Sequence, residues 1–449
     1  MGKIELNKVR KELEAFVEPY RELIGRSERM HWCRMYISGL LLNGERKSIQ
    51  PMAERLPGGN MQNLQQFVNQ SPWEYKPVMN KLLIETAKKF ASAEGVFVLD
   101  DTTLPKKGKK SVGVARQYCG ALGKIANCQN IVSWHYSNSC VGKKQRDLVH
   151  WPIVGELYLP KEWTKDTKRM KKAGIPKERR TYIAKTRLAL NLLDEFHEMI
   201  PHCAIVWDAF YGEDRSFRVE LDKRGEKYVG AIPYSQVFWP LDTVLKTTPN
   251  QIGRPRKFAS VKKPTAKAIS AKSYGEKASH WEYIRLKTKK KKIVQATAIR
   301  VMEGNSQYYR KVGAKCWLII EKESSEDINY YVSNFPKETP LKELIYLAHQ
   351  RWTVEQGYQR LKEELGLDHF EGRSWLGLHH HLTLCFMAYD FLLRFKSTLK
   401  KTAFRSHKSD SGLTKFLLPV SARNVGYGLL NNIVHSSIAF NVFPNGFIT

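Results

Sequence analysis

The stretch Val96-Phe-Val-Leu-Asp-Asp-Thr102 specifies the first strand of the predicted fold. Four apolar residues followed by two acids are typical of a strand that is buried on both faces and carries carboxylates at its C-terminal end. Two short strands, a long helix and a fourth strand are expected downstream, at 111–118, 130–136, 180–199 and 202–207. The helical crossover makes the fourth strand parallel to the first. Asp208, which follows that strand, should therefore meet Asp100 or Asp101 at one edge of a mixed α/β sheet.

The residues before this strand have a helical pattern. Apolar residues recur at helical spacing within 6–16, 30–42 and 78–90. Between them, 48–56 and 61–68 flank a Pro-Gly-Gly-Asn turn and predict two short helices, the second with an exposed side rich in Asn and Gln. Such side chains can read adenine edges in a major groove. A DNA-binding helix-turn-helix and a plain helical hairpin both fit this pattern.

A change of composition after Pro240 separates the sheet from its last helix. Segment 251–275 carries seven Lys or Arg and no acid, as expected of an exposed basic loop. Strand patterns that indicate a β-rich insertion follow at 281–286, 293–302, 317–321 and 329–333. The predicted order is an N-terminal helical DNA-binding domain, a first part of the catalytic core, the β-rich insertion, a second part of the core and a C-terminal region, at 1–92, 93–224, 225–340, 341–400 and 401–449.

The helix expected from Leu341 past Leu365 carries one charged stripe. Arg351, Glu355 and Lys362 fall within about 40° of one another on its surface. A solvated row of ion pairs is the structural interpretation of such a stripe.

The two sheet-edge aspartates favour a chemical interpretation instead. Three carboxylates supply the hard oxygen ligands that Mg²⁺ prefers. Two Mg²⁺ ions, or Mn²⁺ in their place, would support an in-line displacement at phosphorus. Arg351 and Lys362 would then hold the flanking phosphates.

Several ordered motifs carry a family resemblance, at 98–102, 105–108, 111–120, 127–129, 207–215 and 351–375. On these motifs the chain resembles bacterial insertion-sequence transposases of the DDE type, in the cut-and-paste branch. The resemblance implies an RNase H-like mixed-sheet core. It also implies a metal-dependent DNA endonuclease and strand transferase that cleaves at insertion-sequence ends and joins them to target DNA.

The resemblance also implies the catalytic residues. Asp208 corresponds to the second carboxylate and Glu355 to the third, and the family pattern of an acidic pair before Thr makes Asp100 the first, with Asp101 as its alternate. Asp100, Asp208 and Glu355 are the metal ligands that it implies. Only one of the two neighbours is expected to bind metal, because adjacent strand residues face opposite sides.

Related cut-and-paste transposases carry a Tyr, Arg, Glu, Lys signature. Arg351, Glu355 and Lys362 match its spacing, but its tyrosine position holds Ala348 and the nearest tyrosine is Tyr346. The sequence therefore does not predict a tyrosine-assisted hairpin intermediate.

The basic residues that we predict to contact DNA are Arg351, Lys362, Lys106, Lys107, Arg116, Arg254, Arg256 and Lys257. The last three belong to Gly253-Arg-Pro-Arg-Lys257, which resembles a minor-groove hook, with a generic basic loop as the alternative. His379-His-His381 should have a structural or DNA-facing role, since consecutive helical residues diverge too far to bind one metal. Trp317 and Tyr330 could stack on a flipped base, but core packing is the favoured interpretation.

Composition narrows the class of partner. The formal net charge of +30 over 449 residues favours a polyanion, and double-stranded DNA, both element ends and target, is the expected one. The longest apolar stretch, 382–395, is too short to cross a bilayer, so no membrane partner is expected. Seven cysteines without a CxxC pair fit a reducing cytosol, and we expect a cytoplasmic, nucleoid-associated protein. Cutting two ends together implies a homodimer in the synaptic complex.

Two other functions fit parts of the sequence. A structure-specific DNA nuclease on the same fold would use the same carboxylates. A DNA-binding regulator would use the N-terminal helices and carry an inactive core. The complete Asp, Asp, Glu set favours an active transposase over the second of these alternatives.

Overall fold

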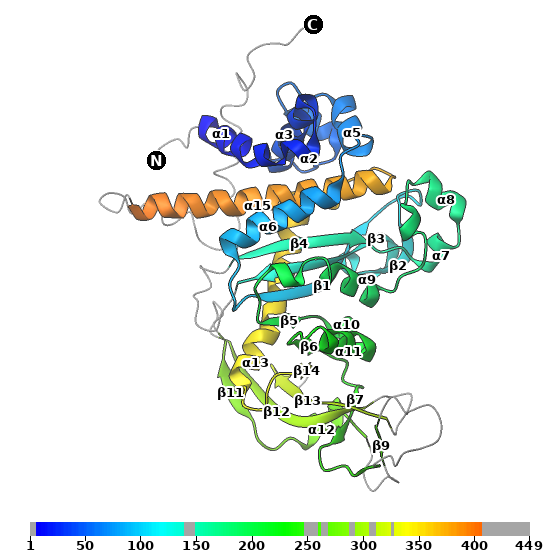
Figure 1. The fold of residues 1–449 in the computed structure, drawn as a ribbon, viewed down its shortest axis with the longest axis vertical. Coiled ribbons are helices and arrows are strands. Elements are labelled where there is room, and N and C mark those ends of the chain that lie inside the picture. Colours follow the sequence, from blue (N-terminus) through cyan, green and yellow to red (C-terminus); the bar gives the residue numbers. More distant parts are fainter. Residues whose placement is uncertain are drawn as a thin grey trace.

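The computed structural model describes residues 6–138, 149–246, 259–261, 268–286, 292–304, 311–324 and 327–405. Figure 1 shows three layers: N-terminal helices at one end, a five-stranded sheet in the middle, and a nine-stranded sheet at the other end. The long helix α15 (Trp375–Arg405) runs between the N-terminal helices and the five-stranded sheet. The predicted α/β class, with a helical N-terminal region and a β-rich insertion, is confirmed.

The N-terminal layer is built from amphipathic helices whose apolar sides share one core. They are α1 (Leu6–Val17), α2 (Arg21–Ile24), α3 (Ser27–Leu41), α4 (Ile49–Arg55), α5 (Met61–Asn69) and α6 (Tyr75–Phe90). Asn60 caps α5 by accepting a hydrogen bond from the backbone N–H of Asn63 at 3.0 Å. Leu64 and Phe67 on α5 are buried, whereas Gln62, Gln65 and Gln66 are exposed. The predicted helix pair is present, and its binding to DNA stays a prediction.

The five-stranded sheet has the order β2-β3-β1-β5, and β4 also pairs with β3. Its strands are β1 (Val96–Pro105), β2 (Ala115–Cys119), β3 (Lys124–Ser137), β4 (His150–Leu157) and β5 (Ala204–Val206). As predicted, β5 is parallel to β1 and pairs with it from Val96 to Val98. Strand β3 is antiparallel to β1 along all ten residues of β1.

Three details of this sheet differ from the sequence prediction. Strand β4 was not predicted, because Pro152 interrupts its pattern; the proline sits at an irregularity in the pairing with β3, where a missing N–H is tolerated. Strand β2 begins only at Ala115, after a turn in which Gly113 adopts a φ of +70°. The helix expected over 180–199 is shorter, α9 (Lys185–Leu193), followed by a single 3₁₀ turn.

A fourth difference concerns the acidic pair. Asp100 and Asp101 lie in the middle of β1 and not at its end, because β3 pairs with β1 as far as Pro105. Strand β5, however, stops at Val206 opposite Val98. The carboxylates therefore still lie just past the end of the neighbouring parallel strand, as the predicted sheet edge requires.

Short helices connect these strands around a core of large aromatic side chains. They are α7 (Lys161–Thr164), α8 (Thr167–Lys172), α10 (Ala209–Glu213) and α11 (Arg215–Lys223). Trp134, Trp151, Trp163 and Trp207 are fully buried among these elements. Their burial packs the sheet and its connections around one hydrophobic core.

The nine-stranded sheet is antiparallel, with the main order β10-β7-β12-β13-β14-β6. Its elements are β6 (Val229–Ala231), β7 (Val237–Pro240), β8 (Leu245–Lys246), β9 (Ala259–Val261), β10 (Ile269–Ser270), α12 (Ala271–Lys277), β11 (Glu282–Arg285), β12 (Ile293–Gly304), β13 (Lys311–Lys322) and β14 (Ile328–Ser333). An isolated parallel bridge between Ile205 and Tyr228 joins its β6 edge to β5. The described part of 251–275 forms β9, β10 and the start of α12, so it is not simply an exposed loop. The predicted domain boundaries stay a prediction.

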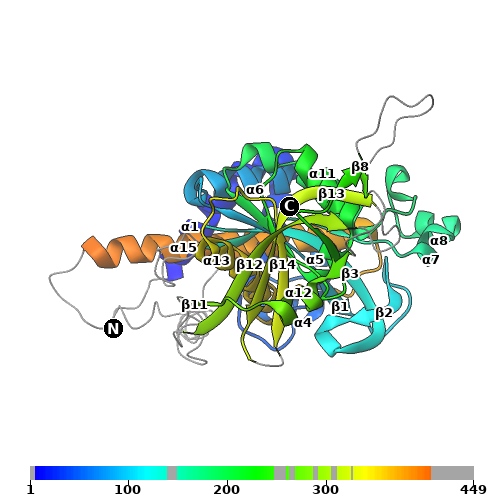
Figure 2. The ribbon, with the colours of Figure 1, turned by 90° about the horizontal axis from the view of Figure 1, so that it is seen from below.

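The helix expected from Leu341 past Leu365 is present in successive pieces. They are α13 (Leu341–Ala348), a 3₁₀ turn at His349–Arg351, α14 (Trp352–Gln359) and a π-helical turn at Arg360–Glu364. Figure 2, a view from below, shows α13 beside the strands of the nine-stranded sheet.

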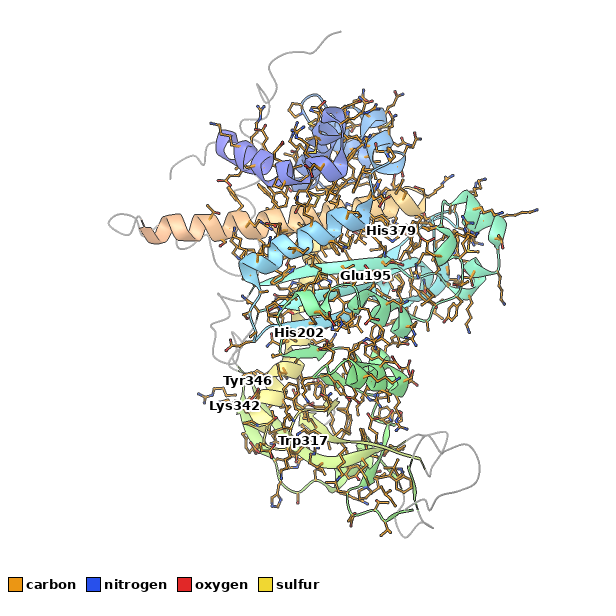
Figure 3. The ribbon with its side chains drawn as sticks, in the orientation of Figure 1. Glu195, His202, Trp317, Lys342, Tyr346 and His379 are labelled. Atoms are coloured by element: carbon orange, nitrogen blue, oxygen red, sulfur yellow. The ribbon has the colours of Figure 1, made fainter. Side chains whose placement is uncertain are left out.

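The three consecutive histidines of α15 are buried and hydrogen-bonded. His379 faces the carbonyl of Trp375 and accepts from the N–H of Leu157 on β4, and Figure 3 shows it on the helix above the sheet. His380 stacks on Trp73 at 3.6 Å between ring centroids. The hydroxyl of Tyr36 lies 2.8 Å from His381. The histidine triplet is therefore structural and joins α15 to the layers on both sides.

Candidate active site

Three aspartates gather where β1 passes the end of β5. Asp100 and Asp101 come from β1, and Asp208 directly follows β5. Asp208 caps α10: its Oδ1 accepts a hydrogen bond from the backbone N–H of Tyr211 at 3.2 Å. The strand order and this cap together bring the three carboxylates to one edge of the sheet.

The two neighbouring aspartates have different environments. Asp101 is neutralised, because its Oδ2 accepts hydrogen bonds from Asn130 and from Lys185, whose Nζ lies 2.7 Å away. The side chain of Asp100 is 13% exposed, and its nearest cation is Arg351, with Nη1 3.9 Å from Oδ2. Burial, followed by the negative charges of Asp208 and Asp101, raises the pKa of Asp100 well above its ordinary value. The charged form of Asp100 is therefore less well compensated than that of Asp101.

Asp208 shares this environment. Burial raises its pKa, and the charge of Asp101 adds to the increase, while the hydrogen bond from Tyr211 and the charge of Arg351 oppose it. Carboxylates that repel one another in a poorly solvated place create a strong preference for a cation.

The helical segment with Glu355 lies along β1. Arg351 donates from Nη2 to Glu355 Oε1 at 2.7 Å while its Nη1 faces Asp100. Further along, Lys362 Nζ donates to the carbonyl oxygen of Thr103 at 3.0 Å, and burial lowers the pKa of this lysine. The charged stripe is thus present, but Lys362 contacts the protein backbone, and Glu355, 59% exposed, is bound to Arg351.

These residues meet some of the requirements of a divalent-metal site. In the described ranges, no group of three or more His, Cys, Asp or Glu residues has ligating geometry. Asp100 and Asp208 nevertheless supply hard oxygen donors that are close enough to repel one another. The guanidinium of Arg351 lies between Asp100 and Glu355, so a cation already links the first carboxylate to the third. Carboxylate oxygens are the donors that hard divalent cations prefer, but Glu355 is held by Arg351 in this arrangement.

A buried hydrogen-bond chain supports the site from behind, and the sequence analysis missed it. The hydroxyl of Tyr358 on α14 donates to the carbonyl oxygen of Asp100 at 3.2 Å and lies 2.6 Å from Ser133 Oγ. From Ser133 the contacts continue through His135 and His150 to Tyr389 of α15. Burial lowers the pKa of His135 to about 3, so this chain is neutral. No pattern in the sequence links these residues, which come from four separate segments.

Other predicted DNA-binding residues have different surroundings. Lys106 Nζ donates to the carbonyl oxygens of Asp368 and Phe370 at 3.1 and 2.6 Å, and burial lowers its pKa to about 8. Lys107 and Arg116 are exposed. The predicted hook residues Arg254, Arg256 and Lys257 lie outside the described residues.

The aromatic candidates are packed or hydrogen-bonded within the protein. Tyr346 donates its hydroxyl to the carbonyl oxygen of Arg285 at 2.7 Å, and Ala348 is buried. Trp317 donates to the carbonyl oxygen of Pro336 at 3.0 Å, and Tyr330 is 8% exposed. Figure 3 places Trp317 and Tyr346 in the half of the molecule that holds the nine-stranded sheet. Core packing is therefore the role that the structure gives Tyr330.

In this mixed sheet the acidic pair of β1 lies just past the end of the parallel strand β5, and Asp208 directly follows β5, as expected of a nuclease of the DDE type. Comparison with known proteins agrees with this class. The family model described as DDE superfamily endonuclease matches residues 19–292, and the chain belongs to this family. The matched residues include Asp100 and Asp208 and end before Glu355.

The chain is also similar to a probable transposase for insertion sequence element IS701 from Microchaete diplosiphon, with 26% identity over 196 residues. The match covers 43% of this chain and 46% of that relative, so the chain spans about half the length of the curated relative it matches. Together the two comparisons confirm the resemblance to insertion-sequence DDE transposases.

Proposed function

We propose that this protein is a DNA transposase that cleaves DNA at the ends of an insertion sequence and joins the freed strand to target DNA. The observation that carries the proposal is the gathering of Asp100, Asp101 and Asp208 where β1 passes the end of β5, in a chain of net charge +30. Excess positive charge attracts the DNA backbone, and three buried or half-buried carboxylates close together favour a bound cation.

In the proposed reaction Asp100, Asp208 and Glu355 hold the divalent metal. When bound, Mg²⁺ or Mn²⁺ would activate an attacking oxygen and stabilise the leaving oxygen at phosphorus. Arg351, released from Glu355, would hold a neighbouring phosphate by two N–H donors. Lys185 and Asn130 hold Asp101 by hydrogen bonds, which leaves Asp100 as the first carboxylate that we propose to bind metal. Lys362 fixes α14 to β1 through the carbonyl of Thr103.

The proposed partners are duplex ends of the element, target DNA and a second copy of the chain, with cut-and-paste transposition in the cytoplasm. No helix in the described part of the chain is long and apolar enough to cross a membrane. A structure-specific nuclease remains the second candidate, since it would use the same carboxylates. It would cleave without joining the product strand to a target duplex.

The test compares neighbouring acids on the same elements. Asp100→Asn and Glu355→Gln should lose metal-dependent cleavage of an end duplex while keeping DNA binding, because each removes an oxygen ligand at constant size. Asp101→Asn should keep part of the activity. Glu363→Gln, an exposed acid on the turn after α14, is the matched control and should cleave normally. Normal cleavage by Asp100→Asn and Glu355→Gln in Mg²⁺ would remove the proposed site.

A further inference from the structure

A cavity of ≈ 780 Å³ lies away from the aspartates, between the start of β2, helices α7 and α8, and the segment before α15. Six of its lining residues are cations and one, Glu162, is an acid. The cations are Lys109, Lys110, Arg116, Arg169, Lys172 and Arg373. Among the described residues none of the six has a carboxylate within 4 Å, so this positive charge is not balanced inside the protein.

The walls of this basic cavity are held rigidly. The Trp163 indole donates to the carbonyl oxygen of Val114 at 2.7 Å, and the Arg169 guanidinium lies 3.7 Å above the Trp163 ring. Arg169 also donates to the carbonyl oxygen of Lys109 at 2.7 Å. The backbone N–H of Trp375 donates to Ala173, which ties α8 to the start of α15. Of the six cations, these contacts hold Arg169 in place, and the other five are exposed.

The cavity continues onto one face of the β2–β3 hairpin. Arg116 pairs with Asn127, which also lines the cavity, and Tyr118 pairs with Ile125 two positions further out. Since side chains two apart share a face, Tyr118 and Ile125 extend the surface that Arg116 and Asn127 begin. Their exposed fractions are 67% and 60%, and Leu122 at the turn is 47% exposed. An aromatic and aliphatic surface is thus attached to the basic cavity.

Figures 1 and 2 place β2, α7 and α8 together at one end of the molecule, opposite the projecting C-terminal end of α15. The exposed apolar residues therefore lie on an outer edge of the protein. Isolated exposed apolar residues are ordinary, but three on one hairpin beside six unpaired cations indicate a specific partner.

We propose that the basic cavity and the outer face of the β2–β3 hairpin form a binding groove for an unpaired DNA strand, with phosphates in the cavity and a base stacked on Tyr118. This inference rests on the proposed DNA chemistry and adds a second site to it. Phosphates alone would suit a duplex equally well. The exposed aromatic favours a single strand, because only an unpaired base offers its face to a tyrosine ring.

The first test measures binding of fluorescent single-stranded and blunt duplex oligonucleotides of equal sequence, in EDTA. Tyr118→Ala should weaken single-strand binding by about fivefold or more, the loss expected for one stacked base. Tyr118→Phe should retain binding, and duplex binding should be unchanged in both variants. Unchanged single-strand binding by Tyr118→Ala, or an equal loss for both oligonucleotides, would overturn the proposal.

The second test removes charge. The triple variant Lys110→Ala, Lys172→Ala and Arg116→Ala should flatten the salt dependence of single-strand binding by about 2 in slope between about 50 and 200 mM salt. The matched control is Lys88→Ala, Lys223→Ala and Lys337→Ala, which removes the same charge from exposed lysines that each have a carboxylate within 4 Å. An equal decrease of the slope in the control variant would show that only net charge matters, and it would contradict the proposal that phosphates bind in the basic cavity.

A third test uses the unaltered protein, so it does not depend on the folding of variants. A single strand with abasic positions should bind about fivefold or more weakly than the intact strand, because it has no base to stack. Equal affinity would overturn the stacking contact. None of these measurements requires cleavage. Single-strand binding that depends on Tyr118, without cleavage of end duplexes, would support the groove and contradict the proposed function. Cleavage of end duplexes, with single-strand binding that does not depend on Tyr118, would support the proposed function and contradict the groove.

Discussion

Each of the two sheets contains a buried acid, and the two acids differ in how closely cations compensate their charge. Glu303 on β12 is 3% exposed and has a guanidinium on each oxygen: Arg218 Nε lies 2.7 Å from Oε1 and Arg215 Nε 3.1 Å from Oε2. Asp100 on β1 faces Asp208 and Asp101 instead, and its nearest cation is 3.9 Å away. The charge of Glu303 is compensated closely by its own chain, and the charge of Asp100 only weakly.

The difference indicates which cluster serves function. A buried charge is costly unless it is paired, so a fold that needs an acid for stability supplies its partner, as α11 does for Glu303. Placing Asp100, Asp101 and Asp208 together costs stability, and the proposed function explains this cost by a cation that completes the site. Substitutions in the first cluster should therefore affect folding, and those in the second should affect chemistry.

The largest expected effect is on chemistry. Asp208→Asn should slow end cleavage by roughly a thousandfold or more, since several kcal/mol of charge stabilisation by the metal is lost. Stability should stay the same or rise, because an asparagine oxygen can still cap α10 and one repelling charge is gone. Single-turnover cleavage and a melting curve measure both. Asp242→Asn, at an exposed acid, is the control, and a large loss of stability in Asp208→Asn would break the comparison.

The complementary substitution tests the compensated cluster. Arg218→Ala should lower the free energy of unfolding by about 3 to 5 kcal/mol, because Glu303 loses a buried partner. Urea unfolding measures the loss. Lys223→Ala removes an exposed cation from the same helix α11 and should cost less than about 1 kcal/mol. A similar small loss in Arg218→Ala would mean that the Glu303 cluster does not stabilise the fold.

The next prediction concerns Arg351, which could contribute to folding stability, to cleavage or to both. It contacts both Asp100 and Glu355, but it is 35% exposed, so its ion pairs should contribute no more than about 1 kcal/mol to stability. If it holds a phosphate, Arg351→Ala should fold normally and slow cleavage by about tenfold or more, with partial rescue in Arg351→Lys. Cleavage at the wild-type rate in Arg351→Ala would mean that Arg351 holds no phosphate and serves only to pair with Asp100 and Glu355.

The sequence predicted where the aspartates meet, but it did not predict which residues neutralise Asp101. The juxtaposition of β1 with β5 followed from the crossover rule, which needs only the order of the elements. The partners that neutralise Asp101, namely Lys185 and Asn130, come from distant segments without any shared motif. Lys106 and Lys362 were predicted to contact DNA from their charge and their places in the motifs, and the structure shows their ammonium groups on backbone carbonyls. Charge patterns predict where basic residues occur but not which of them turn inward.

The last prediction asks whether backbone carbonyls alone can compensate a buried charge. Lys47 is 5% exposed and donates to the carbonyl oxygens of Leu40 and Glu364, and burial lowers its pKa from 10.5 to about 8. The unfolded chain therefore binds more protons than the folded chain between these two values, and stability should rise with pH across that window by at most about 1.4 kcal/mol per pH unit. Below the folded pKa the cost of burying the charged ammonium is present in full.

Lys47→Met keeps the apolar stem and removes the titrating group, so the wild type should gain stability over this variant as pH rises from about 8 toward 10. Urea unfolding at several pH values measures this difference, with exposed Lys11→Met as the control. A difference that does not change with pH would mean that two carbonyls solvate Lys47 as well as water does. Backbone dipoles would then have to be counted beside carboxylates as compensation for buried charge in this protein.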